Sequence, residues 1–181
     1  NDARFFYANR CIIPYINEGV KMVGEGIEPA LIENGAKLLG MPVGPLQLID
    51  ETSIDLANQI AIATKTALGE KYQEDASDDI LSFMVDQKRL GRKVNAGFYE
   101  YNERGQRLKL WRGSITKWPL TQNQPNIEDI KNRLALIQAL EAVRALEEGV
   151  LTNVREGDVG AILGWGCMPW AGGPFGWLNL I

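Results

Sequence analysis

Residues 9–26 read NRCIIPYINEGVKMVGEG, and residues 132–149 read NRLALIQALEAVRALEEG. The two stretches share Asn, Arg, Glu, Val, Glu and Gly in the same order and spacing, displaced by 123 residues. Unrelated segments of this length are expected to share about one residue. A second echo follows each stretch, MPVGPL at residues 41–46 and MPWAGGPF at residues 168–175. The sequence therefore predicts a duplicated module.

The first copy is predicted to be helical. From residue 5 to residue 23, apolar residues recur at three- and four-residue steps, which is typical of a helix with one buried face, and Gly24 ends it. Pro14 removes one internal hydrogen bond, so we expect either a kink or a helix that begins near this proline. Further helices are expected from Pro29 to Leu39, over residues 46–50, from the cap Ser53 to near Gly69, and from the cap residues 77–79 to Leu90.

The second copy is predicted to begin with a long helix that Asn126 caps and Gly149 ends. A short helix near residues 159–163 follows, and then a loop rich in Gly, Trp and Pro over residues 164–176. Nothing after this loop corresponds to the fourth and fifth helices of the first copy. We therefore expect the second copy to be partial and the chain to be a piece of a larger protein.

The segment between the copies has a different pattern. Residues 97–101 and 108–111 alternate like strands on either side of a turn, which predicts a small β-hairpin near residues 97–111. Residues 112–125 contain prolines without periodicity and are predicted to be a linker. The predicted fold is all-α and consists of two helical modules: residues 1–111 form the first repeat, residues 112–125 the linker and residues 126–181 the partial second repeat.

Composition excludes several classes of protein. The chain has 181 residues, of which 45% are hydrophobic and 23% charged, and these values are typical of a soluble globular protein. The net charge of -4 is mild and the two signs are interleaved, which argues against nucleic acid as a partner. No apolar run reaches the roughly 18 residues of a membrane span, and the first residues do not resemble a signal peptide. We expect an intracellular protein.

Histidine is absent from the sequence. This removes the most common general base and metal ligand, as well as any Ser-His or Cys-His pair. Cys11 and Cys167 are far apart in the sequence and predict neither a disulfide framework nor a zinc site, so each is interpreted as a small buried residue. The chain is therefore not expected to carry out chemistry alone or to hold a metal.

A few polar residues remain as candidates. Asn9 and Asn132 stand near the heads of the two long helices, where capping is the first interpretation. The alternative is that one of these amides, which both donates and accepts, holds a catalytic base or a substrate oxygen. Glu18 and Glu141 are interpreted as polar helix contacts. The loop GWGCMP at residues 164–169 lacks a preceding strand, a third glycine and a phosphate-binding lysine, so it is interpreted as an interhelical turn.

Three segments carry a resemblance to a known family. They are NRCIIPYINE at residues 9–18, GMPVGPLQLID at residues 40–50 and KVNAGFYEY at residues 93–101. In order and spacing they resemble the C-terminal domain of L-3-hydroxyacyl-CoA dehydrogenases, over most of residues 5–101. The second copy, with Gly-Gly-Pro-Phe at residues 172–175, resembles the second C-terminal repeat of the multifunctional enzymes of fatty-acid β-oxidation.

The resemblance implies a fold like the C-terminal domain of 6-phosphogluconate dehydrogenase and a definite division of labour. In that family an N-terminal Rossmann domain binds NAD and supplies a His-Glu pair, while the helical domain closes over the acyl-CoA and contributes an asparagine from its Asn-Arg motif. That asparagine corresponds to Asn9 as a catalytic residue, and Asn132 keeps the capping interpretation. The loop of Met41, Pro42, Val43, Gly44 and Pro45 is expected to lie near the substrate.

The resemblance also implies partners and a location. They are the acyl-CoA substrate, a Rossmann domain of the same polypeptide that binds the NAD, and a homodimer; no cofactor is expected within this chain. The compartment is the cytoplasm in a bacterium, and otherwise the peroxisome or mitochondrion. Two alternatives stay open: a stand-alone helical module for dimerisation or acyl-CoA binding, and another hydroxyacid dehydrogenase with a related helical domain. A reading frame that continues upstream into a Rossmann fingerprint would favour the dehydrogenase.

Overall fold

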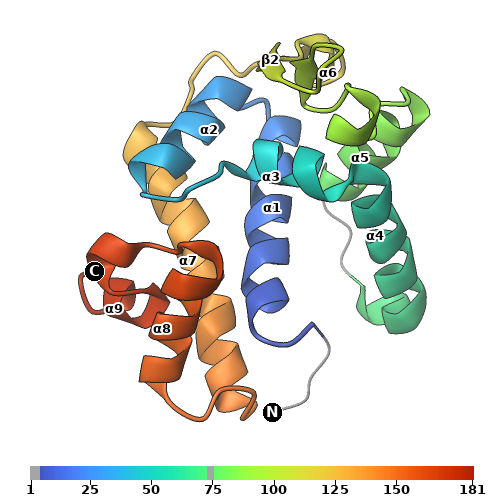
Figure 1. Cartoon of the computed structure of the whole chain (residues 1–181). Helices are drawn as coiled ribbons and strands as arrows, with labels where there is room; N and C mark the ends of the chain where they lie inside the picture. Colours follow the sequence, from blue (N-terminus) through green and yellow to red (C-terminus); the bar gives the residue numbers. More distant parts are fainter. Residues whose placement is uncertain (1–4, 73–75) are drawn as a thin grey trace. The chain divides into compact units, whose positions relative to one another are not determined.

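The structure, a computed structural model, describes residues 5–72 and 76–181 and consists mainly of helices (Figure 1). The α-helices are α1 (Ala8–Gly24), α2 (Pro29–Leu38), α3 (Pro45–Thr52), α4 (Ile54–Leu68), α5 (Ala76–Asp86), α6 (Gly113–Lys117), α7 (Ile127–Glu147), α8 (Val154–Trp165) and α9 (Pro174–Leu178). Short 3-10 turns occupy Gly69–Lys71, Arg92–Val94 and Pro169–Ala171. The prediction of an all-α protein is confirmed.

The only sheet in the described part of the chain is the predicted hairpin. Strand β1 (Tyr99–Tyr101) pairs antiparallel with β2 (Arg107–Leu110), with Tyr99 opposite Leu110 and Tyr101 opposite Arg107. The register shifts between Tyr99 and Tyr101. The turn between the strands is closed by Asn102, whose side-chain oxygen accepts from the backbone N–H groups of Arg104 and Gln106 at 3.0 Å.

The helices follow the sequence duplication. The repeated stretches fall on α1 and α7, and each is followed by a helix, a Gly- and Pro-rich loop and a shorter helix: α2 and α3 in the first copy, α8 and α9 in the second. Within residues 5–72 and 76–181, helices α4 and α5 have no counterpart after α9. The division at residues 112–125 stays a prediction.

By its contacts the chain forms two compact units, each built from separate segments. One unit consists of the N-terminal segment up to Glu18, Leu31–Gly44 and Pro125–Ile181. The other consists of Gly19–Ala30 and Pro45–Gln124. The first unit therefore combines segments of both sequence copies, so the compact units are not the two repeats.

The core of the first unit contains small side chains on α7. Ala135, Ala139, Ala142 and Ala145 are all fully buried, and the last two form a cluster with Cys11, Leu151 and Phe175. Small residues let neighbouring backbones approach closely: a Cβ added at Gly35 of α2 would collide with Ile130 of α7. This close packing brings both sequence copies into one core.

The position of Pro14 differs from the prediction. It lies inside α1, which begins at Ala8, so a helix start near the proline is wrong. Cys11 and Tyr15, on either side of it, are fully buried. Helices in proteins are stabilised mainly by the tertiary packing of one face, and here that packing outweighs the hydrogen bond that proline removes.

In the second unit, α4 packs against α5, and α3 contacts β1. Ser53 stands at the N-cap of α4, as predicted, but with φ 100° and without a capping hydrogen bond. Its hydroxyl donates to the carboxylate of Asp55 instead. Helix α5 begins at Ala76, so Asp78 and Asp79 lie in its first turn. Negative charge there interacts favourably with the positive end of the helix dipole.

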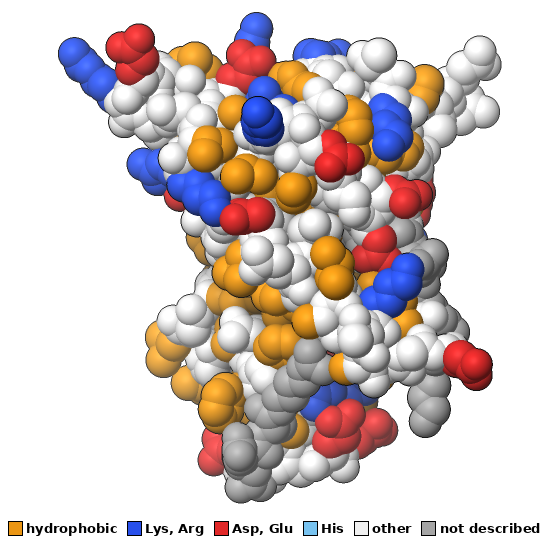
Figure 2. All heavy atoms as spheres, turned by 90° about the vertical axis from the view of Figure 1, so that its right-hand side faces the viewer, with side chains coloured by type: hydrophobic (Ala, Val, Ile, Leu, Met, Phe, Trp, Pro, Cys, Tyr) orange, Lys and Arg blue, Asp and Glu red, His pale blue; other side chains and the backbone are white. Residues whose placement is uncertain are grey.

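The surface shown in Figure 2 carries both signs of charge. Lys and Arg side chains lie among Asp and Glu side chains there, with hydrophobic side chains between them, and neither sign gathers in one patch. A single-sign patch is what attracts a highly charged partner such as nucleic acid. None of the described helices is both long enough and apolar enough to cross a membrane.

Candidate functional site

Asn9, the predicted catalytic residue, is the second residue of α1, and its side chain is exposed. It therefore lies within the first helical turn and not at the N-cap that the capping interpretation required. An exposed amide on the first turn of a helix can donate and accept hydrogen bonds toward a group that approaches from outside.

Asn132, the corresponding residue of the second copy, has a different environment. It lies inside α7, which begins at Ile127, so its interpretation as a helix cap is wrong. The cap is Asn126, whose side-chain oxygen accepts from the backbone N–H of Asp129 at 2.9 Å. The sequence predicts this cap as well. Asn132 lies exposed in the second turn of α7 and has no capping role.

The turn that carries Asn9 is held by both of its flanking polar residues. The hydroxyl of Tyr7 donates to the carbonyl oxygen of Gly157 in α8 at 3.1 Å. The guanidinium of Arg10 donates to Glu148 Oε1 at 3.1 Å and lies 3.5 Å from Glu141 Oε2. The Arg10 side chain is only 14% exposed. Segments of the second copy thus fix the turn on either side of Asn9.

The ion pairs between α1 and α7 are reciprocal. Arg133 donates through Nε to Glu18 Oε1 at 2.7 Å, while Arg10 pairs with Glu141. Because Arg10 corresponds to Arg133 and Glu18 to Glu141, the arginine of each copy binds the glutamate of the other. The two helices therefore pack antiparallel with an approximate two-fold relation. The prediction of polar helix contacts for Glu18 and Glu141 is confirmed.

The predicted substrate-proximal loop is largely packed against the protein. Met41 is buried, and its sulfur accepts from Gln138 Nε2 at 3.8 Å. The carbonyl oxygen of Val43 accepts from the Tyr15 hydroxyl at 2.8 Å, and Gly44 lies directly against the carboxylate of Glu33. Pro42 is exposed, and Pro45 opens α3 in the other unit. Substrate contact by this loop stays a prediction.

The loop between α8 and α9 is the interhelical turn that was predicted. Gly166 ends α8 in the left-handed conformation, with φ 72°. The indole N–H of Trp165 donates to Gln138 Oε1 at 3.0 Å, and that of Trp170 to the carbonyl oxygen of Leu39 at 2.6 Å. Trp177 is buried. These contacts hold the loop against α7 and the end of α2.

Asp50 is a buried polar residue that is not among the candidates predicted from the sequence. Its carboxylate accepts from the backbone N–H groups of Phe98 and Tyr99, each at 2.8 Å, and from the Tyr101 hydroxyl at 3.0 Å. Burial raises the pKa of Asp50 to about 6, although these donors and Arg89 oppose the rise. A Cβ at Gly97 would collide with the carboxylate. The signal in the sequence is an acidic residue at the end of the apolar run LQLID.

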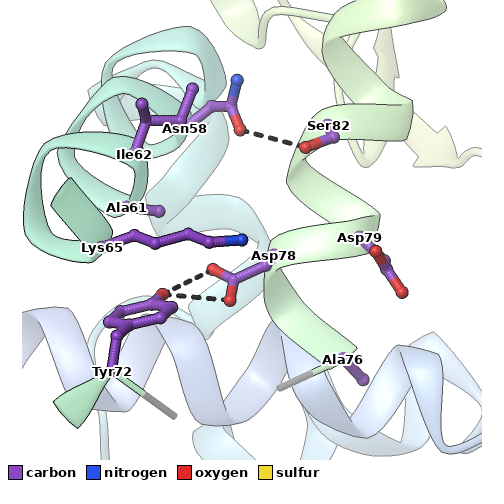
Figure 3. A pocket seen from close by; sticks show the side chains of 9 residues that line it. All are labelled: Asn58, Ala61, Ile62, Lys65, Tyr72, Ala76, Asp78, Asp79 and Ser82. Atoms are coloured by element: carbon purple, nitrogen blue, oxygen red, sulfur yellow. Dashed lines mark hydrogen bonds between the residues drawn. The ribbon is translucent and has the colours of Figure 1, made fainter. Parts of the chain in front are cut away.

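A cavity of about 430 Å³ lies between α4 and α5 in the second unit (Figure 3). The Tyr72 hydroxyl donates to Asp78 at 2.8 and 3.0 Å, and Lys65 extends toward this pair. The other lining residues are Asn58, Ala61, Ile62, Ala76, Asp79 and Ser82. From the sequence, Asp78 and Asp79 are predicted only as residues at the start of a helix. A cavity between two helices forms only when the helices pack, so the sequence pattern of either helix does not reveal it.

The two cysteines fit the interpretation as buried residues. Cys11 and Cys167 are both free and buried. Burial raises the pKa of each thiol to about 12. Thiolate is the reactive form of cysteine, so neither residue supplies a nucleophile near neutral pH.

The residues described do not fit a dinucleotide site. Such a site needs parallel strands and a glycine-rich turn that leads into a helix N-terminus. The sheet of the described chain is a two-stranded antiparallel hairpin. Over the same residues, no group of three Cys, Asp or Glu side chains is placed to hold a metal ion.

Comparison with known proteins gives matches to a family model and to solved structures of dehydrogenases. The model of a family described as the C-terminal domain of 3-hydroxyacyl-CoA dehydrogenase matches residues 6–101. The dehydrogenase part of multifunctional enzyme 1 from C. elegans is similar over 87% of this chain, with 28% identity and a TM-score of 0.67. 3-Hydroxybutyryl-CoA dehydrogenase from Escherichia coli K12 is similar over 97% of this chain, with 17% identity and a TM-score of 0.66. The second likeness shows the fold alone.

This chain is much shorter than either of these proteins. It covers 36% of the C. elegans chain and 52% of the Escherichia coli chain.

Proposed function

Because this chain belongs to the family of 3-hydroxyacyl-CoA dehydrogenase C-terminal domains, we propose that it is the substrate-closing and assembly domain of an NAD-dependent L-3-hydroxyacyl-CoA dehydrogenase of fatty-acid β-oxidation. On this proposal it acts as part of a multifunctional enzyme and is inactive alone. The second copy of the repeat and the likeness to the dehydrogenase part of a multifunctional enzyme support that assignment. The expected compartment is a bacterial cytoplasm, or a peroxisome or mitochondrion.

The observation that carries the proposal is the placement of Asn9. It belongs to the family's Asn-Arg motif, its side chain is exposed, and Tyr7 and Arg10 anchor the turn around it. An amide held in this way can fix the orientation of an imidazole and stabilise charge that develops on a substrate oxygen. It does not transfer the proton itself, which agrees with the absence of histidine from this sequence.

The redox chemistry is assigned to another part of the enzyme. NAD accepts hydride from the substrate when it is bound, and we place it, with the His-Glu base, on a Rossmann domain of the same polypeptide. The described residues of this chain offer no dinucleotide site, so their roles are to close over the acyl-CoA and to present Asn9. The Met41 to Pro45 loop is the proposed substrate-proximal segment, with Pro42 as its exposed residue.

The test is Asn9→Ala in the natural full-length polypeptide that contains this chain. We expect kcat to fall by about 100-fold, the size of effect seen when one donor to a developing charge is removed, while the melting temperature stays unchanged. Asn132→Ala is the matched control, because Asn132 is the corresponding exposed amide of the second copy. Equal loss of activity in both variants, or a loss explained by unfolding, contradicts the proposal.

A second candidate is a stand-alone helical module for dimerisation or acyl-CoA binding. Exposed apolar side chains of the second copy favour it: Leu163 is 82% exposed and Trp170 59%. Apolar groups on a surface mark interaction sites when they are contiguous. Such a module has no need of Asn9, so the same variant separates the two candidates.

A further inference from the structure

The second copy contributes acidic side chains to the turn that carries Asn9. Arg10, the neighbour of Asn9, lies between two glutamates of the long segment around α7: Glu141, 3.5 Å away, and Glu148, to which it donates two hydrogen bonds. Arg10 and Glu141 are each 14% exposed, whereas Glu148 is 58% exposed. A guanidinium with two parallel bonds to one carboxylate is restrained in orientation as well as in position.

Arg133, the corresponding arginine of the second copy, provides an ion pair with which that of Arg10 can be compared. Arg133 binds Glu18 at 2.6 and 2.7 Å, so it too is held by the glutamate of the opposite copy. Its neighbour Asn132, however, lies inside α7. The chain thus contains two related ion pairs between the same helices, and one of them adjoins the candidate catalytic amide.

We propose that Glu141 and Glu148 are positioning residues for Asn9, which they hold through Arg10. The inference rests on the proposed function of Asn9 and gives the second copy a role in the active site of the first. In this role the glutamates act on Arg10 and not on the substrate. They fix the orientation and the position of the first turn of α1. They therefore also fix the direction in which the Asn9 amide points.

The physical reason is the sensitivity of a catalytic step to placement. Asn9 lies on the first turn of α1, where the helix lacks part of its internal hydrogen bonding. Without the glutamates this turn keeps only the Tyr7 bond to Gly157 as a polar anchor among those described above. A displacement of about 1 Å at a catalytic group costs up to about 100-fold in rate. Partial loosening of one turn is expected to cost about tenfold in kcat.

The experiment compares Glu141→Gln/Glu148→Gln with Glu18→Gln in the natural full-length polypeptide. The first variant removes both acidic partners of Arg10 and, at Glu141, also a partner of the exposed Arg144. The second removes the Glu18 partner of Arg133. Both nearly conserve side-chain volume. We expect the first to lower kcat by about tenfold with KM within twofold of the wild type, and the second to leave both constants unchanged. Similar melting temperatures for the two variants show that the kinetic difference is not one of stability.

A double-mutant cycle with Asn9→Ala tests whether the glutamates act through Asn9. In the Asn9→Ala background we expect removal of Glu141 and Glu148 to cause no further loss of kcat. A loss of the same factor in both backgrounds, or equal losses for the Glu18 variant, overturns the inference. If Asn9→Ala alone leaves kcat unchanged, the proposed function fails; if Asn9→Ala lowers kcat while the glutamate variant does not, only this inference fails.

Discussion

Asp50 connects two segments of the second unit that are almost 50 residues apart in sequence. Its carboxylate receives the N–H groups of Phe98 and Tyr99 and the Tyr101 hydroxyl, while Arg89 donates to the carbonyl oxygens of Gly97 and Tyr99 at 2.8 and 3.2 Å. One buried acid and one partly buried arginine thus satisfy the polar groups of the turn before β1. Buried polar groups cost stability unless they are paired in this way.

The ionisation of Asp50 predicts a dependence of stability on pH. Its pKa rises from 3.8 to about 6 because of burial. The folded state therefore binds this proton more tightly than the unfolded state, so the stabilisation is present in full below about pH 3.8 and is lost as the pH rises through about 6. Relative to Asp50→Asn, the free energy of unfolding should fall by roughly 2 kcal/mol between pH 4 and pH 7.

Urea unfolding at several pH values measures this difference, and Asp55→Asn is its control. The hydrogen bond from Lys93, followed by that from Ser53, lowers the pKa of Asp55 to about 2. Its stabilising contribution is therefore present above about pH 3.8 and is lost as the pH falls, which is the opposite sign. A gap between wild type and Asp50→Asn that does not vary with pH contradicts the assignment.

At the scale of elements, the beginning of α7 depends on one side chain. The Asn126 oxygen caps the N–H of Asp129, and Glu128 and Asp129 add negative charge to the first turn. We expect Asn126→Ala to lower the free energy of unfolding by about 1 kcal/mol, since it leaves a helix-end donor without this partner. Asn132→Ala should be neutral or slightly stabilising, because alanine is the better helix former in an exposed interior position. Chemical denaturation of the two variants checks this, and an equal loss in both argues against the cap.

The elements that could be predicted from the sequence are those with a long periodic pattern of apolar residues, or a clear alternation, and recognisable end residues. Helix α7 is predicted from the repeated stretch, the Asn126 cap and the glycine after the last turn. The hairpin is predicted from the alternation of its residues. Helix α6 was missed inside the predicted linker because its five residues are too short to show periodicity. Helix α8 was predicted too short because Gly157 and Gly160 interrupt its apolar pattern, although Gly157 is needed for packing against Phe175.

Less of the candidate site than of the fold could be predicted from the sequence. Asn9 could be chosen over Asn132 only through the family resemblance, because both are asparagines beside an arginine. The bonds from Arg10 to Glu148 and from Arg133 to Glu18 join residues 138 and 115 positions apart. Periodicity describes one helix at a time, so it identified the polar positions on α1 and α7 but not their partners. The partners follow only from the antiparallel packing of the two copies.

At the scale of the whole molecule, the two sequence copies and the two compact units have different boundaries. The first unit takes the beginning of the chain, the segment Leu31–Gly44 and everything from Pro125 onward, and its core contains Cys11 together with α7 and α9 residues. The second copy therefore completes the packing around the Asn-Arg turn of the first. Folding of this unit requires contacts between distant parts of the chain, and closing such long loops carries an entropic cost.

The 181-residue chain is expected to be inactive by itself. Because the described residues form no parallel sheet with a glycine-rich turn, and because the sequence contains no histidine, we expect neither NAD⁺ binding nor NAD-dependent oxidation of a 3-hydroxyacyl-CoA. Calorimetric titration of the folded chain with NAD⁺, with the full-length polypeptide as positive control, measures the first; absorbance of NADH measures the second. Helical circular dichroism shows that the chain is folded. Saturable binding with one site per chain, or turnover by pure material, would mean that the redox site is built from these residues after all.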